Sequence, residues 1–182
     1  MPAVLEQIHL ERGLSQLAVQ VENGILHGTT HIHDGGKPLA ALPYQHGNLH
    51  GPMTLMHSNG HLAAQMQYAA DKAHGPARFF SPDGSLQRQA MYKQGLLHGE
   101  ARTFNADGSV ALIEQYRAGQ LHGVQQRFHP NGQLATRTQY QDGKLLLVSQ
   151  AFNLDGRPLN AAQKPISWLR WWWRRLKGDA AG

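Results

Sequence analysis

Residues 95–119 read GLLHGEARTFNADGSVALIEQYRAG, and this pattern recurs along most of the chain. Leu-His-Gly returns every 23 or 24 residues, with Ala-His-Gly in one slot, and its histidines are His27, His50, His74, His98 and His122. Other positions keep a step of 24 residues, among them Gly60, Gly84, Gly108, Gly132, Tyr68, Tyr92, Tyr116 and Tyr140. Self-similarity at a fixed period is typical of repeat proteins in which each unit is one supersecondary element.

Each unit contains two turn signals separated by short runs of residues. Asp-Gly and Asn-Gly between such runs favour β-hairpins, because glycine accepts a positive φ. Residues 62–68 alternate between apolar and other side chains, which indicates a strand with one apolar face. About seven residues between turns are too few for a stable helix. The sequence predicts an all-β fold over residues 1–160, an elongated antiparallel sheet of about six to seven hairpin repeats of 24 residues. We expect aromatic and leucine columns to stabilise it.

Composition narrows the possible functions. The 182 residues include 17 Lys+Arg, 12 Asp+Glu and no cysteine, which excludes disulfides, thiolate nucleophiles and cysteine-based metal sites. The first residues do not resemble a secretory signal, and no run approaches the length of a membrane span. We therefore expect a cytoplasmic protein, peripheral to the inner membrane if its C-terminal segment binds lipid.

Residues 161–182 form a second segment, a tail rich in tryptophan and arginine. Its residues 168–177, WLRWWWRRLK, carry all four tryptophans. Drawn as a helix, they place tryptophan and leucine on one face and cations opposite, which predicts a short amphipathic C-terminal helix. The predicted contact residues for a membrane or partner are Trp168, Leu169, Arg170, Trp171, Trp172, Trp173, Arg174, Arg175, Leu176 and Lys177.

Three docking surfaces remain open for this predicted helix. An anionic bilayer suits tryptophan and arginine together. The last repeat is the second candidate, because the helix could cover an exposed edge strand. A partner protein or nucleic acid is the third. The repeats lack a consistent basic column, since Arg78 and Arg102 align with the neutral Thr54 and Gln126. We therefore do not expect nucleic acid as a partner.

The recurring histidines are predicted to be structural. Equivalent positions in successive units lie two strands apart, or ~10 Å, whereas a zinc–nitrogen bond is only ~2.1 Å. His31 and His33 near His9 remain a weaker alternative as metal ligands. The turn aspartates, such as Asp83 and Asp107, are expected to make turn hydrogen bonds. Standard catalytic motifs are absent from the sequence, so we expect no enzymatic activity and no cofactor.

Several of these residues together resemble the MORN repeat, specifically the bacterial MORN variant of antitoxin-type (YwqK-like) proteins. They are Gly95-Leu96-Leu97-His98-Gly99, Phe104, Asp107-Gly108 and Tyr116-Arg117-Ala118-Gly119, and the resemblance covers about residues 10–160. It implies extended arrays of antiparallel hairpins, protein interaction and, for some members, an antitoxin or immunity role opposite a toxin. It implies no catalytic residues.

Our functional hypothesis is therefore a non-enzymatic interaction module, an antitoxin or immunity-type protein that binds and occludes a cognate toxin or effector. Alternating polar residues on one sheet face are expected to give specificity, for example Gln87, Gln89, Arg137 and Gln139. The alternative is a membrane-peripheral scaffold anchored by the C-terminal segment.

Overall fold

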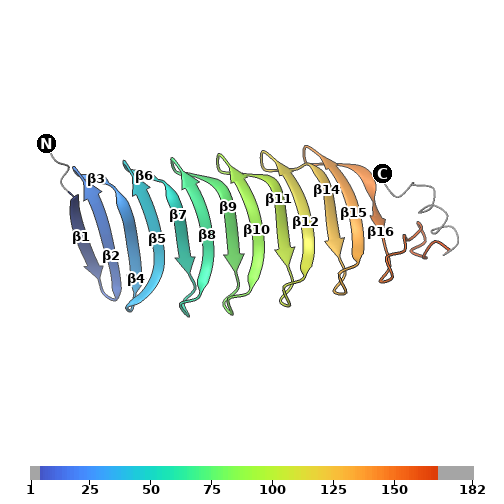
Figure 1. Cartoon of the computed structure of the whole chain (residues 1–182), viewed down its shortest axis with the longest axis horizontal. Helices are drawn as coiled ribbons and strands as arrows, with labels where there is room; N and C mark the ends of the chain where they lie inside the picture. The colour runs from blue at the N-terminus through green and yellow to red at the C-terminus, as the bar shows by residue number, and fades with distance from the viewer. Residues whose placement is uncertain (1–4, 168–182) are drawn as a thin grey trace. The chain divides into compact units, whose positions relative to one another are not determined.

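The computed structural model describes residues 5–167, and their regular structure is entirely β (Figure 1). The strands are β1 (Leu5–Arg12), β2 (Ser15–Glu22), β3 (Ile25–Leu26), β4 (Gly28–Asp34), β5 (Lys37–Gln45), β6 (Asn48–Leu49), β7 (Gly51–Met56), β8 (Leu62–Ala69), β9 (Lys72–Phe80), β10 (Leu86–Lys93), β11 (Leu96–Phe104), β12 (Val110–Arg117), β13 (Gln120–Leu121), β14 (Gly123–Phe128), β15 (Leu134–Gln141) and β16 (Lys144–Ala151). The all-β prediction is confirmed. The helix predicted over residues 168–177 lies outside the described residues. Within the described part of the chain, no helix has the length and apolar character of a membrane span.

The chain divides into two compact units, Met1–Gly99 and Glu100–Gly182, with the boundary inside β11. In the first unit the hydrogen-bonded order is β1-β2-β4-β5-β7-β8-β9-β10, with β3 and β6 added beside β2 and β5. In the second unit β12, β14, β15 and β16 follow one another in the same way, with β13 beside β12. The strand pairs with a defined register are antiparallel, so consecutive hairpins form the sheet, as the repeat pattern predicts.

Two kinds of turn alternate along the hairpins. At one end lie two-residue turns in which both residues have positive φ, such as Gln94-Gly95 with 55° and 83°. This is the type I′ geometry, whose twist matches that of the flanking strands. At the other end lie the turns that contain Gly60, Gly84, Gly108, Gly132 and Gly156. There only the glycine has positive φ, 89° at Gly84, and its N–H donates to the Ser81 carbonyl at 2.9 Å. This is a type I turn closed by a glycine bulge.

The Leu-His-Gly motifs at His27, His50 and His122 each form a bulge. Between the pairs Tyr44↔Leu49 and Ala41↔Thr54, β5 advances by three residues while its partner advances by five. The two additional residues include His50, and the positive φ of the following glycine favours glycine there. The same shift separates the pairs of β2 with β3 and β4, and of β12 with β13 and β14.

The bulges also connect successive hairpins. The N–H of the second residue in the next type I′ turn donates to the carbonyl just before the motif's histidine. Gly47 donates to Leu26 at 2.8 Å, and Gly143 donates to Leu121 at 2.8 Å. In these repeats the turn of the following hairpin therefore lies beside the motif's histidine.

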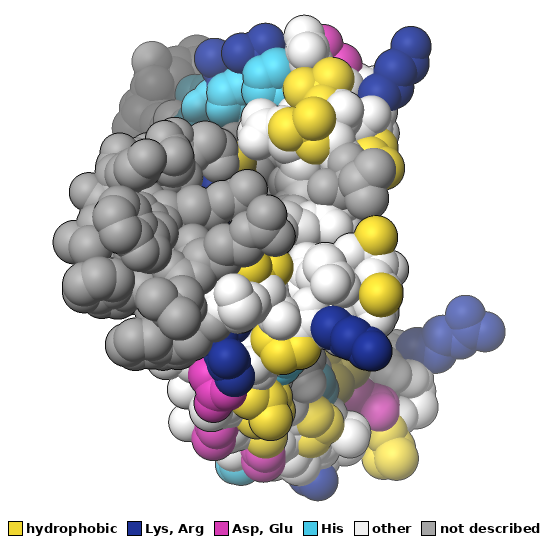
Figure 2. Space-filling view, turned by 90° about the vertical axis from the view of Figure 1, so that its right-hand side faces the viewer, with side chains coloured by type: hydrophobic (Ala, Val, Ile, Leu, Met, Phe, Trp, Pro, Cys, Tyr) yellow, Lys and Arg dark blue, Asp and Glu magenta, His cyan; other side chains and the backbone are white. Residues whose placement is uncertain are grey.

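Several of the most buried residues of the first unit lie in one row across a single sheet face. Met53 pairs with Met66, Met66 with Ala77, and Ala77 with Ala90. Ala77 is 1% exposed and Ala90 is 4% exposed, whereas tyrosines such as Tyr68 are half-buried. The most buried positions thus hold small side chains, which larger neighbours on the same face can cover, instead of the expected aromatic and leucine columns. Figure 2 shows hydrophobic side chains exposed among polar ones, in keeping with exposed leucines such as Leu147.

Candidate functional site

In the first unit, the sheet face opposite the buried row carries polar side chains. Gln65 pairs with Thr54 on one side and with Arg78 on the other, and Arg78 pairs in turn with Gln89. Because side chains alternate between faces along a strand, directly paired residues share a face. Gln65 and Arg78 are exposed, and Gln89 is half-buried. The row therefore presents amide and guanidinium groups side by side to solvent.

Arg78 differs from Arg102, its equivalent in the next repeat, in having no partner among the described residues. It makes no hydrogen bond or ion pair with any residue between 5 and 167. Arg102, which the repeat aligns with it, donates from Nε to Glu100 Oε1 at 2.6 Å, and Gln115 donates to the other Glu100 oxygen at 3.1 Å. The charge of Arg102 is thus neutralised by Glu100, which leaves Arg78 as the aligned cation able to bind an external acceptor.

The corresponding face of the second unit carries Gln126 between Ile113 and Arg137, and Arg137 pairs with Gln150. Of the four residues predicted to give specificity, Gln89 and Arg137 lie in such polar rows. Gln139 lies two residues beyond Arg137 on the same strand and pairs with Val124. Gln87 lies between the pairs Leu86↔Phe80 and Arg88↔Phe79, at the bulge in β10, and so has no direct partner on β9.

The opposite face of the second unit has a buried polar row that sequence reasoning missed. Glu114 is 7% exposed and accepts a hydrogen bond from Gln125 Nε2 at 3.2 Å. Thr138 pairs with Gln125 and is 5% exposed, and its hydroxyl lies 2.7 Å from the Ser149 hydroxyl. In the first unit the corresponding row holds apolar residues, Met53, Met66, Ala77 and Ala90. The alternation of side chains along the strands does not reveal that this row is polar in the second unit. The one signal in the sequence is the carboxylate of Glu114, at a position whose side chain faces inward.

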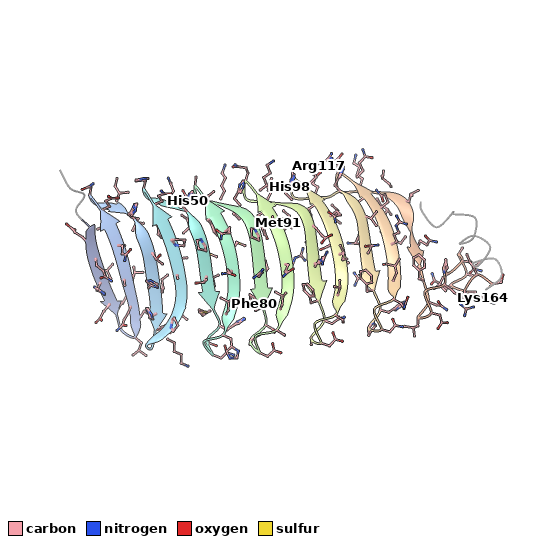
Figure 3. The ribbon with its side chains drawn as sticks, viewed as in Figure 1. His50, Phe80, Met91, His98, Arg117 and Lys164 are labelled. Atoms are coloured by element: carbon pink, nitrogen blue, oxygen red, sulfur yellow. The ribbon has the colours of Figure 1, made fainter. Side chains whose placement is uncertain are left out.

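The recurring histidines lie at the end of the hairpins that carries the type I′ turns. Figure 3 shows His50 and His98 at that end of the first unit, with Phe80 at the other end. The side-chain contacts of these histidines differ from repeat to repeat. His122 Nδ1 lies 3.0 Å from Asp142 Oδ1, whereas His27 Nδ1 lies 3.2 Å from Glu22 Oε2. No two column histidines belong to a group with metal-ligand spacing among the described residues.

The alternative ligand set of His9, His31 and His33 does not assemble either. Ala18 pairs with both His9 and His31, so the two histidines lie on strands that flank β2. The rings of His31 and His33 are 6.4 Å apart between centroids. Among the described residues, none of the three belongs to a group with metal-ligand spacing.

The turn aspartates make the hydrogen bonds predicted for them. Asp83 accepts hydrogen bonds from the Ser81 hydroxyl and from the N–H and hydroxyl of Ser85, the last two at 2.9 and 2.7 Å. These bonds, led by that from the Ser81 side chain, lower the pKa of Asp83 to about 2. The Ser109 side chain likewise lowers the pKa of Asp107. Their repeat equivalent Asn59 accepts the N–H of His61 at 3.1 Å in the same way, and its Nδ2 also donates to the carbonyl of Pro82, in the next turn, at 2.6 Å.

The remaining predicted residues are placed as follows. Gly60, Gly84, Gly108 and Gly132 all have positive φ, as the turns require. Tyr68, Tyr92, Tyr116 and Tyr140 are half-buried. The predicted contact residues Trp168–Lys177 lie outside the described residues.

Comparisons with known proteins bear on the repeats alone. Residues 73–94 and 121–146 match the family described as MORN repeat variant. No curated protein matches the chain. Similar solved structures include the crystal structure of TarM, with 14% identity and a TM-score of 0.32 over 77% of this chain. A second is a mutant S. aureus TarM in complex with Fondaparinux, alpha-GlcNAc-glycerol and UDP. It has 13% identity and a TM-score of 0.32 over 76% of this chain. The chain spans 20% of the length of each, and such likenesses carry no argument about function. The similarity to the MORN repeat variant therefore covers two stretches of this protein.

Proposed function

We propose that this protein is a non-enzymatic protein-binding module whose contact surface in the first unit is the row of Gln65, Arg78 and Gln89. The observation that carries the proposal is the exposed guanidinium of Arg78, which has no partner among residues 5–167 and lies between two glutamine amides. Arginine is enriched at protein interfaces because it offers five donors in a rigid planar group. An acidic or carbonyl-rich surface of a partner fits this row.

The finer form of the proposal is an antitoxin or immunity-type protein that occludes a toxin or effector. A repeated sheet supports steric occlusion, because each hairpin adds contact area at a regular spacing without a dedicated pocket. Glutamine and arginine side chains then select the partner through hydrogen bonds, because a wrong partner leaves desolvated polar groups unpaired.

The test begins with affinity purification of the full chain from its native cell extract, followed by identification of a stoichiometric partner. Arg78→Glu reverses the charge in the centre of the row and should weaken that complex by at least about tenfold. Lys72→Glu is the matched control, because Lys72 is an exposed cation at the start of the same strand, β9. Equal binding by the two variants would refute the assignment of the surface.

The antitoxin role has a separate test. The purified partner should arrest growth when expressed alone, and co-expression of the wild-type chain should restore growth while Arg78→Glu should not. A harmless partner that still requires Arg78 would retain the binding module and refute the antitoxin role.

We also propose, from the composition of residues 168–177, that this segment contacts an anionic membrane surface. Interfacial tryptophans and adjacent cations suit the headgroup region of a bilayer. Full-length protein should sediment with vesicles containing phosphatidylserine and not with neutral vesicles. Trp172→Ala combined with Arg174→Glu should abolish the binding, and binding that persists in this variant would refute the anchor.

A further inference from the structure

Three side chains with metal-binding chemistry meet at one place in the first unit. Glu22 is the last residue of β2, His27 lies between β3 and β4, and His46 opens the turn after β5. One ligand atom from each lies within 4.8 Å of the other two, and no other group of three in the described chain has this spacing. The repeat pattern hides the cluster, because His46 is outside the recurring histidine column.

The backbone explains why these residues meet. The bulge at His27 is closed by the His27 N–H, which donates to the Gln20 carbonyl at 3.0 Å. The next type I′ turn is held beside it because Gly47 N–H donates to the Leu26 carbonyl at 2.8 Å. That turn begins with His46, whose φ is 49°. Histidine is among the non-glycine residues enriched in this left-handed region, so the turn tolerates it.

The imidazole of His27 has a nitrogen whose bonding is incomplete. Nδ1 is buried and makes no hydrogen bond, although Glu22 Oε2 lies 3.2 Å away and the His46 ring centroid lies 5.4 Å from that of His27. A buried nitrogen without a partner costs free energy, and a metal bond satisfies its lone pair. Two ligands of a tetrahedral zinc ion, each bonded at about 2.1 Å, lie roughly 3.4 Å apart. The nitrogen and the carboxylate oxygen already have nearly this separation.

The three side chains also border a space that can hold an ion. A hollow of ≈ 180 Å³ is lined by Glu22, Asn23, Ile25, His27 and His46. The side chains of Glu22 and His27 are 25% and 33% exposed, so an ion can enter from solvent.

We propose that Glu22, His27 and His46 bind a divalent first-row transition metal ion of the Zn²⁺ class. Two imidazoles and one carboxylate match the ligand preferences of this class, and three protein ligands leave a position for water or for a side chain of a bound partner. Such a site would couple the type I′ turns of two successive hairpins through the ion.

The other repeats show that the arrangement is specific to this place. The trios at equivalent positions include Gln45, His50 and Ala70, and Arg117, His122 and Asp142. The first of these trios has one ligand side chain, and the second replaces the carboxylate of Glu22 by a guanidinium, which repels a cation. The fold supplies the same backbone at each repeat, and only one repeat supplies three ligands.

The test is a titration of the full chain with Zn²⁺, followed by calorimetry, and with Co²⁺, followed by visible absorption. We expect one ion per chain and the d–d bands of a four-coordinate Co²⁺ site. Glu22→Gln, His27→Ala and His46→Asn should each weaken binding by at least about tenfold and remove the bands. Asparagine is chosen at position 46 because it accepts positive φ. His50→Ala removes one column histidine without touching the trio and should bind as the wild type does.

Circular dichroism and thermal unfolding without metal establish that each variant is folded. If His27→Ala unfolds, Glu22→Gln and His46→Asn decide the question, because the first keeps the side-chain shape and the second keeps the turn. Binding that is equally weakened in His50→Ala, or unchanged in Glu22→Gln and His46→Asn, would show that scattered surface histidines capture the ion and would overturn the site.

Discussion

Replacing Asn59 by aspartate tests the idea that side chains of one turn hold the next turn in place. Asn59 Nδ2 donates to the Pro82 carbonyl at 2.6 Å, and Asn59 Oδ1 accepts the N–H of His61 at 3.1 Å. Aspartate keeps the acceptor for His61 and loses the donor. It also places a carboxylate oxygen next to the Pro82 carbonyl oxygen, so the variant should be less stable.

The magnitude follows from what remains after the substitution. A hydrogen bond of this type contributes about 0.5–1.5 kcal/mol net. The Pro82 oxygen keeps His61 Nδ1 at 2.7 Å, so it is not left without a partner. Asn59 is exposed, so the new carboxylate can turn toward water instead of being desolvated. We therefore expect a loss of about 1 kcal/mol in the free energy of unfolding, or about 2–4 °C in Tm for a chain of this size.

The assay is urea and thermal denaturation followed by circular dichroism at pH 7. Ser58→Asp is the matched control, because it adds the same charge one residue earlier in the same turn, where the native side chain makes no hydrogen bond to any described residue. Asn131→Asp repeats the experiment in the second unit, since Asn131 Nδ2 donates to the Leu154 carbonyl at 2.9 Å. If Asn59→Asp is no less stable than Ser58→Asp, the turn-to-turn hydrogen bond does not contribute and the reasoning is refuted.

Three further predictions concern the turns and the buried row. Ala118→Gly should raise the free energy of unfolding by about 1 kcal/mol, because Ala118 has a φ of 48°, and unchanged urea denaturation would contradict this. Ala77→Leu should lower it by about 1–3 kcal/mol, because Ala77 is 1% exposed and a larger side chain displaces its neighbours; a Tm equal to that of the wild type would show that the row has room. The Ser81 and Ser85 hydrogen bonds hold the pKa of Asp83 at about 2, below its ordinary 3.8. The contribution of Asp83 to stability is therefore present above pH 4 and is lost as the pH falls toward 2. An NMR titration that gives Asp83 an ordinary pKa would refute the turn geometry.

Much of the fold follows from local sequence rules. The alternation in residues 62–68 and the Asp-Gly turns are each contained in a few residues, so the strands and hairpins can be predicted without knowledge of distant contacts. The register could not be predicted in this way. The bulge at His50 adds two residues to one strand relative to its neighbour, and a step of 24 residues is compatible with several such arrangements.

In the candidate sites too, the types of residue can be predicted from the sequence, whereas their neighbours are known only from the structure. The sequence identified Gln89 and Arg137 as polar positions, but only cross-strand pairing shows that Arg78 lies between two glutamines and that Glu100 neutralises Arg102. The sequence predicts that the recurring histidines are structural, because equivalent positions lie too far apart to share a metal ion. The group that has ligand spacing includes only one column histidine, because the next turn brings His46 to it.

The sequence by itself determined that this protein consists of consecutive β-hairpin repeats, because the period, the turn glycines and the side-chain alternation are properties of short segments. The tertiary structure alone decided which side chains are neighbours. Alanine rather than tyrosine occupies the most buried positions, and Glu22, His27 and His46 converge. The physical reason is that the contacts between hairpins depend on the register that the bulges set and on the hydrogen bonds between successive turns, and both involve residues of two neighbouring repeats.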